Sequence, residues 1–503
     1  MSRILPSSYR LLAVLTVVPL TAAFALSQDD TSPQTSGPAP AASAPAAQNA
    51  ENPPLSGLDR PTSEPAFGGR SYLIPGLQLS EAIDSNSALS GGRTTEASRG
   101  LGALDLQKIW KTYQVGIDYL AGGEYYTGSR PAGQNRAYQL HSLGSDQRLL
   151  WRTGQLSIRD TFSYLPEGSF GLGSFGGFGG FSSALGNSGI SGVGAGSGLG
   201  GGIAGGTPTG LFGGGQFGTF SIQPRIDNLS IIDIVQGLSP RSTATIGGGY
   251  NFTDYLNKSQ SPFPIINSQQ TTAQVGYDYL ISRKSQIGLV GAFQDFHFPR
   301  AGVGNIQAYV VNALYGHRIS GRLNLVIGGG PQVVLIGSSL VNVAGTFYQI
   351  PAKTVVDGSG SVTLGYTVTS RTHLSLLYHH YVTAGSGFLA GARTDAIRGT
   401  AAHRFGRKWS GDADGGYSRH IALQSIIPNV GINSHSYHYW YAGGTLHRQL
   451  GRSFSAFGTY QYDRFGAGSC SNSAGSLSVC GQSRNRHTGV VGLVWHPHPI
   501  RLD

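Results

Sequence analysis

The chain has 503 residues, a net charge of +10, 39% hydrophobic residues, 12% charged residues and 77 glycines. Soluble globular domains carry about 25% charged residues, and beyond one N-terminal stretch no apolar run approaches the ~20 residues that a membrane-spanning helix needs. The composition therefore argues against an ordinary soluble domain and against a helical membrane protein. It favours strands that face lipid on one side and water on the other.

The N-terminus has the pattern of a secretory signal peptide. Arg3 and Arg10 precede an apolar run from Leu11 to Ala25, which ends in a small-residue A-x-A site. This run is too short to span a membrane, so we predict a signal peptide over residues 1–25 that is cleaved after Ala25. Residues 26–70 are rich in Pro, Ala, Ser and Gln, a composition that cannot bury enough apolar surface to fold. We predict a disordered periplasmic linker there.

A hairpin rhythm starts near Leu101 and runs to the C-terminus, within a predicted barrel of residues 71–496. Strand-like segments meet across short turns that carry Ser, Arg, Lys or Gly, and longer connections separate the hairpins. The short turns are Ser282–Ser285, Ser320–Arg322, Thr369–Thr372, Gly406–Lys408 and Gly451–Ser453. Short turns on one side and long loops on the other are typical of an outer-membrane β-barrel.

Alternation within the strands points the same way. Between Thr271 and Tyr279 one face carries Ala273, Val275 and Tyr277, and the other carries polar residues that include Asp278. A period of two places each set on one face of a sheet. In a bilayer the apolar face is outside and the polar face lines the lumen, whereas a soluble sandwich would bury the apolar face. Together with the signal peptide, this predicts an all-β fold, a transmembrane antiparallel up-and-down β-barrel.

The count of strands is even, at about 16 to 18, with both termini periplasmic. The first strand and 226–237 alternate least cleanly. A barrel of this size leaves an aqueous channel. The expected strands are 72–85, 100–110, 113–124, 136–151, 155–165, 226–237, 242–253, 269–281, 285–297, 305–318, 322–336, 355–369, 372–384, 393–405, 408–420, 435–449, 452–465 and 485–496.

Two features belong to the expected long loops. A Gly/Phe-rich loop spans 165–225, and its Ser169–Phe220 tract is of low complexity. We favour a mobile extracellular tract; a constriction folded into the lumen, or self-association at the cell surface, are the alternatives. In an exported protein the two cysteines, Cys470 and Cys480, are expected to form a disulfide.

The strand register predicts two sets of residues. Tryptophans beside the short turns or at the end of the last strand predict an aromatic girdle at the membrane interface: Trp110, Trp151, Trp409 and Trp495. Charged residues of both signs are expected to face the lumen, which predicts weak ion selectivity: Asp118, Arg159, Asp278, Asp357, Arg398, Arg404, Asp412 and Asp414. Many other basic residues lie in the short turns, so the net charge is no evidence for nucleic-acid binding.

No constellation of residues marks an enzyme, a metal site or a cofactor site. His379 and His380 are adjacent on a strand and therefore point to opposite faces. His435 and His438 also differ in parity. We expect no catalytic residue, no metal ligand and no cofactor.

Several segments resemble a family of porin-like outer-membrane β-barrel proteins found in soil bacteria, including acidobacteria. They are YLIPGLQLSEAIDSN, LGALDLQKIW with QVGIDYLAGGEYY, QRLLWRTGQLSIRDTFSYLPEGSF and PRIDNLSIIDIVQGLSPRSTATIGGGYNF, within roughly residues 71 to 496. The resemblance implies porin-like passage or a link to exopolysaccharide export. Outer-membrane barrels usually end on an aromatic residue. Here Trp495 is followed by His496 and by a C-terminal tail of residues 497–503, together HPHPIRLD.

We interpret the chain as a bacterial outer-membrane barrel that forms a water-filled pore for small hydrophilic solutes or for polysaccharide export. Its expected partners are outer-membrane lipid, the solute and the barrel-insertion machinery, without nucleic acid; the sequence leaves open whether it is a monomer or a homo-oligomer. A non-conducting structural or adhesive surface barrel is the first alternative. An outer-membrane hydrolase, which would need a Ser/His pair on the lipid-facing wall, is the second.

Overall fold

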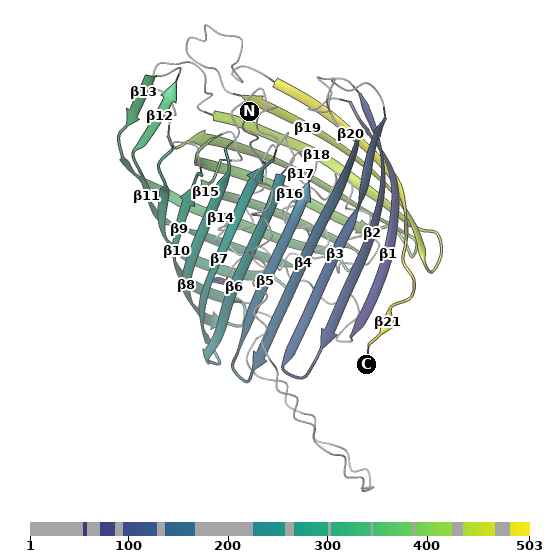
Figure 1. The fold of residues 1–503 in the computed structure, drawn as a ribbon. Coiled ribbons are helices and arrows are strands. Elements are labelled where there is room, and N and C mark those ends of the chain that lie inside the picture. The colour runs from purple at the N-terminus through teal and green to yellow at the C-terminus, as the bar shows by residue number, and fades with distance from the viewer. Residues whose placement is uncertain are drawn as a thin grey trace, which may run out of the picture. The chain divides into compact units, whose positions relative to one another are not determined.

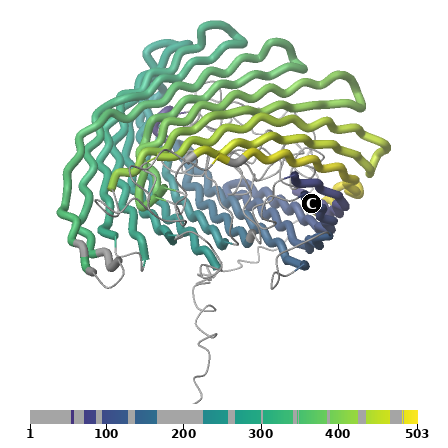
Figure 2. The backbone as a smooth tube through the Cα atoms, turned by 90° about the horizontal axis from the view of Figure 1, so that it is seen from above, coloured from purple at the N-terminus to yellow at the C-terminus, as the bar shows by residue number. Residues whose placement is uncertain are grey.

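The computed structural model describes residues 54–57, 71–85, 94–127, 136–165, 225–256, 266–299, 303–343, 346–385, 389–424, 436–467 and 483–502. Within this part of the chain the strands form an antiparallel sheet that closes into an 18-stranded barrel (Figure 1). The view along the barrel in Figure 2 shows the strands arranged in a ring. The predicted fold class is confirmed.

Consecutive strands of the barrel pair with each other around the ring. Their bounds are β1 (Tyr72–Asp84), β2 (Thr95–Ile109), β3 (Tyr113–Thr127), β4 (Ala137–Trp151), β5 (Gly154–Leu165), β6 (Arg225–Ser239), β7 (Ser242–Tyr255), β8 (Ser268–Ser282), β9 (Ser285–His297), β10 (Ile306–Ser320), β11 (Leu323–Ile336), β14 (Lys353–Thr369), β15 (Thr372–Thr383), β16 (Ala392–Arg404), β17 (Trp409–Ala422), β18 (Ser436–Gln449), β19 (Phe454–Ala467) and β20 (Ser483–Trp495).

The ring is closed by the first and last of these strands. β1 pairs with β2 on one side and with β20 on the other, in a register that runs from Leu77 opposite Trp495 to Asp84 opposite Thr488. An unpaired strand edge would expose a row of amide and carbonyl groups, and closure removes that edge. The first predicted strand, which alternates poorly, is therefore the one that completes the barrel.

The two faces of the wall differ in polarity as the alternation predicts. On β8 the side chain of Val275 is 59% exposed on the outside, and Tyr277 is exposed beside it. The intervening residues Gln274 and Asp278 face the lumen and are buried. The same split recurs on β10, where Tyr309 and neighbouring apolar residues are exposed while Asn312 is buried. The wall thus has an apolar outer face and a polar inner face, the arrangement of a barrel surrounded by lipid.

Three short strands were not expected. β12 (Ser339–Val343) and β13 (Thr346–Ile350) form a hairpin in the long connection between β11 and β14. This hairpin is a separate two-stranded sheet and is not part of the ring. β21 (Ile500–Arg501), within the 497–503 tail, pairs with Tyr72 and Leu73 of β1. Strands of two to five residues are too short to show a period, so the sequence offers no signal for them.

One part of the inner wall is apolar. Near the long-loop ends of β9, β10 and β11, the inward residues Phe296, Ile306 and Val334 join a buried cluster with Ala390 of the β15–β16 connection. Gly391 in that connection has a φ of +74°, and a Cβ there would collide with the side chain of Ile306. Glycine allows both this backbone conformation and the close approach.

Several predictions concern residues outside the described part of the chain. These are the signal peptide, the Ser169–Phe220 tract and the disulfide between Cys470 and Cys480. They stay predictions, as does the linker apart from its residues 54–57. No helix in the described segments is long and apolar enough to cross a bilayer.

The outer wall can be tested with Val275→Arg. Val275 lies at the middle of β8, and its backbone faces Ile246 and Gly291. A charge on the lipid side at mid-depth is expected to lower the free energy of unfolding by about 2–4 kcal/mol, measured by denaturant unfolding of the protein folded in lipid vesicles. The control is Ser370→Arg in the exposed β14–β15 turn, which should change the stability little. Equal effects of the two substitutions would contradict the assignment of the outer wall to lipid.

Candidate functional site: the charged lumen wall

Arginine–carboxylate pairs bridge neighbouring strands on the inner face of the barrel. The pairs are Arg99–Glu124 (β2–β3), Arg159–Asp233 (β5–β6), Arg398–Asp414 (β16–β17) and Arg486–Asp84 (β20–β1). Two further pairs, each between residues two apart on one strand, are Arg148–Asp146 on β4 and Arg225–Asp227 on β6. Residues directly or diagonally opposite on antiparallel strands share a face and lie within reach of each other, which explains why the register brings these charges together.

Geometry supports these contacts as charge-assisted hydrogen bonds. Arg159 Nη2 lies 2.7 Å from Asp233 Oδ1, and Arg486 Nε lies 2.7 Å from Asp84 Oδ2. Such bonds are roughly twice as strong as neutral ones. A buried charge left without a partner would be strongly unfavourable. The pairing therefore gives each of these inward arginines a carboxylate partner.

Two tyrosines of β18 extend this network. Tyr439 and Tyr441 are fully buried on the lumen side, and their rings stack with centroids 5.9 Å apart. The Tyr441 hydroxyl donates to Asp414 Oδ1 at 2.9 Å, and the Tyr439 hydroxyl donates to Asp463. Asp414 thus accepts from Arg398 of β16 and from Tyr441 of β18, and it connects three adjacent strands.

Of the eight predicted lumen residues, three belong to arginine–carboxylate pairs that bridge neighbouring strands. Arg398 pairs with Asp414, and Arg159 pairs with Asp233. Asp357 and Asp412 have other neighbours: Asp357 pairs with Arg393 at 2.9 Å, and Asp412 lies 3.6 Å from His447 Nε2.

The remaining three predicted residues differ in their surroundings. Asp118 lies opposite Asp105 in the β2–β3 register. Arg404, the last residue of β16, is exposed. Asp278 accepts hydrogen bonds from the backbone of Leu55 and Ser56, far away in the sequence.

Several inward charges were missed by the sequence analysis. Asp227 and Asp233 are both buried on the inner face of β6, one of the two strands that alternate least cleanly in the sequence. The two residues are an even number of positions apart, so the sequence already places them on the same face of the strand. Asp84 and Arg486 were missed for a different reason, because they belong to the first and last strands and meet only when the ring closes.

The four predicted girdle tryptophans all lie at short-turn ends of strands. Trp110 directly follows β2, Trp151 ends β4, Trp409 begins β17 and Trp495 ends β20. Trp110 and Trp409 are exposed, with Lys108 Nζ 6.0 Å and Arg448 Cζ 5.1 Å from the respective ring centroids. Trp151 Nε1 donates to Gln236 at 2.9 Å. Half-exposed rings beside cations are suited to a membrane interface.

Histidines make contacts that bear on enzymatic alternatives. Ser285 Oγ lies 2.9 Å from His317 Nδ1 beside a short turn, and the His317 ring stacks on Tyr315. His420 is buried between the hydroxyls of Thr394 and Ser418. Serine hydrolases orient the base with a third group, usually a carboxylate, and the contacts seen for His317 include none. Within the described residues no group of three or more His, Cys, Asp or Glu could hold a metal ion.

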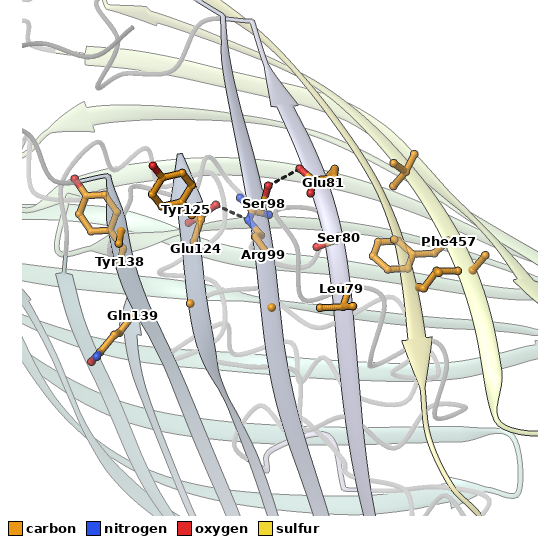
Figure 3. A pocket seen from close by; sticks show the side chains of 17 residues that line it. Leu79, Ser80, Glu81, Ser98, Arg99, Glu124, Tyr125, Tyr138, Gln139 and Phe457 are labelled. Atoms are coloured by element: carbon orange, nitrogen blue, oxygen red, sulfur yellow. Dashed lines mark hydrogen bonds and ion pairs between the residues drawn. The ribbon is translucent and has the colours of Figure 1, made fainter. Parts of the chain in front are cut away.

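A pocket crosses the wall where β1 to β4 meet β19 and β20 (Figure 3). Its lining includes outward residues such as Leu79 and Tyr125, and inward residues such as Phe457. Two pairs of its polar residues are in contact: the Ser98 hydroxyl donates to Glu81 Oε2 at 2.8 Å, and Arg99 pairs with Glu124. These pairs favour a structural role over a solute site.

No known family matches the sequence, and no curated protein matches it. Among solved structures, OpdK of Pseudomonas aeruginosa with vanillate is 10% identical, with 85% of this chain and 98% of that chain covered and a TM-score of 0.39. OccK2 (OpdF) of Pseudomonas aeruginosa in complex with glucuronate is 9% identical, with coverage of 86% and 98% and a TM-score of 0.40. A loop L8 deletion mutant of OmpT from Vibrio cholerae is 12% identical, with coverage of 85% and 100% and a TM-score of 0.30. Likeness at this level carries no functional argument, and the fold assignment rests on the strand pairing itself.

The Arg398–Asp414 pair yields a stability prediction. Asp414→Ala leaves the buried Arg398 guanidinium and the Tyr441 hydroxyl without this acceptor. It should therefore lower the free energy of unfolding by about 3–5 kcal/mol. The double variant Arg398→Leu with Asp414→Leu removes both charges and should be less destabilised than Asp414→Ala, measured by denaturant unfolding in vesicles. A double variant as unstable as the sum of the single variants would show that the pair is not a buried unit.

Proposed function

We propose that the chain forms an outer-membrane channel through which small hydrophilic solutes pass by diffusion. The observation that carries this proposal is the closed ring of 18 strands with a polar inner wall and an apolar outer wall. Barrels of roughly 16 to 18 strands enclose an aqueous channel, whereas eight-stranded barrels are filled by their own side chains.

The paired charges on the inner wall support weak ion selectivity. Inward arginines such as Arg159 and Arg398 lie against carboxylates, so each positive charge is compensated within a few ångströms. The field of a close ion pair falls off rapidly with distance. A solute in the lumen would therefore meet hydrogen-bond donors and acceptors at each pair. We therefore propose that the channel passes neutral or weakly charged polar solutes. Export of a polysaccharide is the other transport function that we propose.

The outer wall and the short turns support placement in a bacterial outer membrane. Exposed apolar residues such as Val275 and Leu289 cover the outside. Arg283, Lys284 and Arg371 lie in short turns at one end of the ring, where they can contact anionic headgroups. The signal peptide would deliver the chain to the periplasm, from which the barrel-insertion machinery would place it in the lipid. We propose no enzymatic activity and no cofactor.

Planar-bilayer recording of the refolded mature protein tests the channel. We expect stable openings and, in a salt gradient, a small reversal potential, because the inward arginines are paired with carboxylates. Folding is verified separately by heat-modifiable migration on gels. A correctly folded barrel that never conducts would overturn the proposal in favour of a structural or adhesive barrel.

Deleting Ser169–Phe220 separates a constricting loop from an adhesive one. We expect the variant to conduct like the intact protein, because we interpret this tract as extracellular. Increased conductance would instead indicate that the tract constricts the lumen. Unchanged conductance with loss of attachment to surfaces, measured on whole cells, would assign adhesion to the tract.

A further inference from the structure

A short stretch ahead of the barrel is bound to the inner wall. Pro54–Gly57 forms a turn in which the side chain of Leu55 is 8% exposed and Ser56 is 0% exposed. Its partners lie on β7 to β10, in the part of these strands between their middle and their short-turn ends. We call this turn the lumen latch and the inner-wall residues that contact it the cradle: Thr245, Gln274, Gly276, Asp278, Val290, Leu314 and Gly316.

Every polar group of Ser56 has a partner in the cradle. The backbone amides of Leu55 and Ser56 each donate to Asp278 Oδ1 at 3.1 Å, and the Ser56 hydroxyl donates to Asp278 Oδ2. The Ser56 carbonyl accepts from Thr245 Oγ1 at 3.0 Å and from the Gln274 side-chain amide. Buried polar groups are costly unless they are hydrogen-bonded, and here the cradle satisfies them as a set.

The side chain of Leu55 occupies an apolar part of the cradle. It packs with Val290 of β9 and Leu314 of β10, and Val326 of β11 lies against the same cluster. These inward positions are apolar on a wall that is otherwise largely polar. The cradle thus offers an apolar pocket to Leu55 and, beside it, a carboxylate to Ser56.

Glycines make room for the lumen latch. A Cβ on Gly276 would collide with the side chain of Ser56, and a Cβ on Gly316 would lie 3.0 Å from Leu55 Cδ2. Gly276 and Gly316 both lie on the inner face, where β-propensity alone would favour other residues. Glycine inside a strand often marks the close approach of another backbone.

Asp278 differs from the inward carboxylates that pair with arginine. Glu124, Asp233 and Asp414 each pair with an arginine. In the described part of the chain Asp278 forms no ion pair with arginine or lysine; instead it accepts from two consecutive backbone amides and a hydroxyl. Oriented amides can stabilise an anion in the same way as a cationic side chain.

We propose that the lumen latch is an internal ligand of the barrel: Leu55 and Ser56 dock in the cradle and thereby hold Pro54–Gly57 in the lumen, where this turn narrows the channel. The narrowing rests on the proposed channel function, whereas the docking does not. Two experiments address these parts separately.

Cross-linking tests the docking in the full mature chain with Cys470 and Cys480 replaced by serine. Ser56 Oγ and Thr245 Oγ1 are 2.7 Å apart, so Ser56→Cys with Thr245→Cys should form a disulfide on mild oxidation, seen as a mobility shift on non-reducing gels. The matched control is Ser56→Cys with Thr459→Cys. Thr459 is buried on the inner face of β19, which lies nine strands away around the ring from β8. Equal cross-linking of the two pairs, or none in a folded barrel, would overturn the docking.

Conductance tests the narrowing. Gly276→Val fills the space that Ser56 occupies and should abolish the Ser56–Thr245 cross-link while raising the single-channel conductance above that of the intact protein. Gly458→Val is the control, because a Cβ at Gly458 on β19 meets no atom within 4 Å; it should change neither readout. Conducting channels with the same conductance in both variants would refute the narrowing. If no variant conducts, the channel function fails and the narrowing with it, while the cross-link still decides the docking.

Discussion

Backbone hydrogen bonding is the constraint on which the rest of this structure depends. A chain surrounded by hydrocarbon has no water to satisfy its amide and carbonyl groups, so a sheet must close on itself. The pairing of β1 with β20 achieves this, from Leu77 opposite Trp495 to Asp84 opposite Thr488. Once the ring is closed, each strand has one face toward lipid and one toward the lumen, and the period of two assigns every side chain to one of them.

The chemistry of the inner wall follows from the register that closure imposes. Charged residues on the inner face cannot turn toward the lipid, and neighbouring strands hold them at separations suited to pairing. Arg398, Asp414 and Tyr441 illustrate the result, since one carboxylate accepts hydrogen bonds from both adjacent strands. The side chains that line the lumen also join the strands to each other. Substitutions in the lumen would therefore affect stability together with selectivity.

The cradle shows a different use of the inner wall. Where other strands place an arginine against a carboxylate, β7 to β10 place glycines, an apolar pocket and Asp278, and the partner is the backbone of Leu55 and Ser56. A binding site for the protein's own chain restricts the lumen without requiring a separate plug domain. Because the contacts lie between the middle and the short-turn ends of the strands, the lumen latch is on the periplasmic half of the wall in the orientation that we propose.

The sequence by itself determined the strands and the direction in which each faces. All eighteen expected strands are present, and most of their ends agree with the structure within a few residues, because turn residues and a period of two are local properties. Arg398 and Asp414 could be assigned to the lumen by parity alone. Their pairing could not be predicted, since it depends on the register between β16 and β17. The pairing of Asp84 with Arg486 needs the ring itself, and the docking of Leu55 and Ser56 against Asp278 joins residues more than 200 positions apart. Only the tertiary structure decided these contacts, because no local pattern records which distant residues a closed barrel brings together.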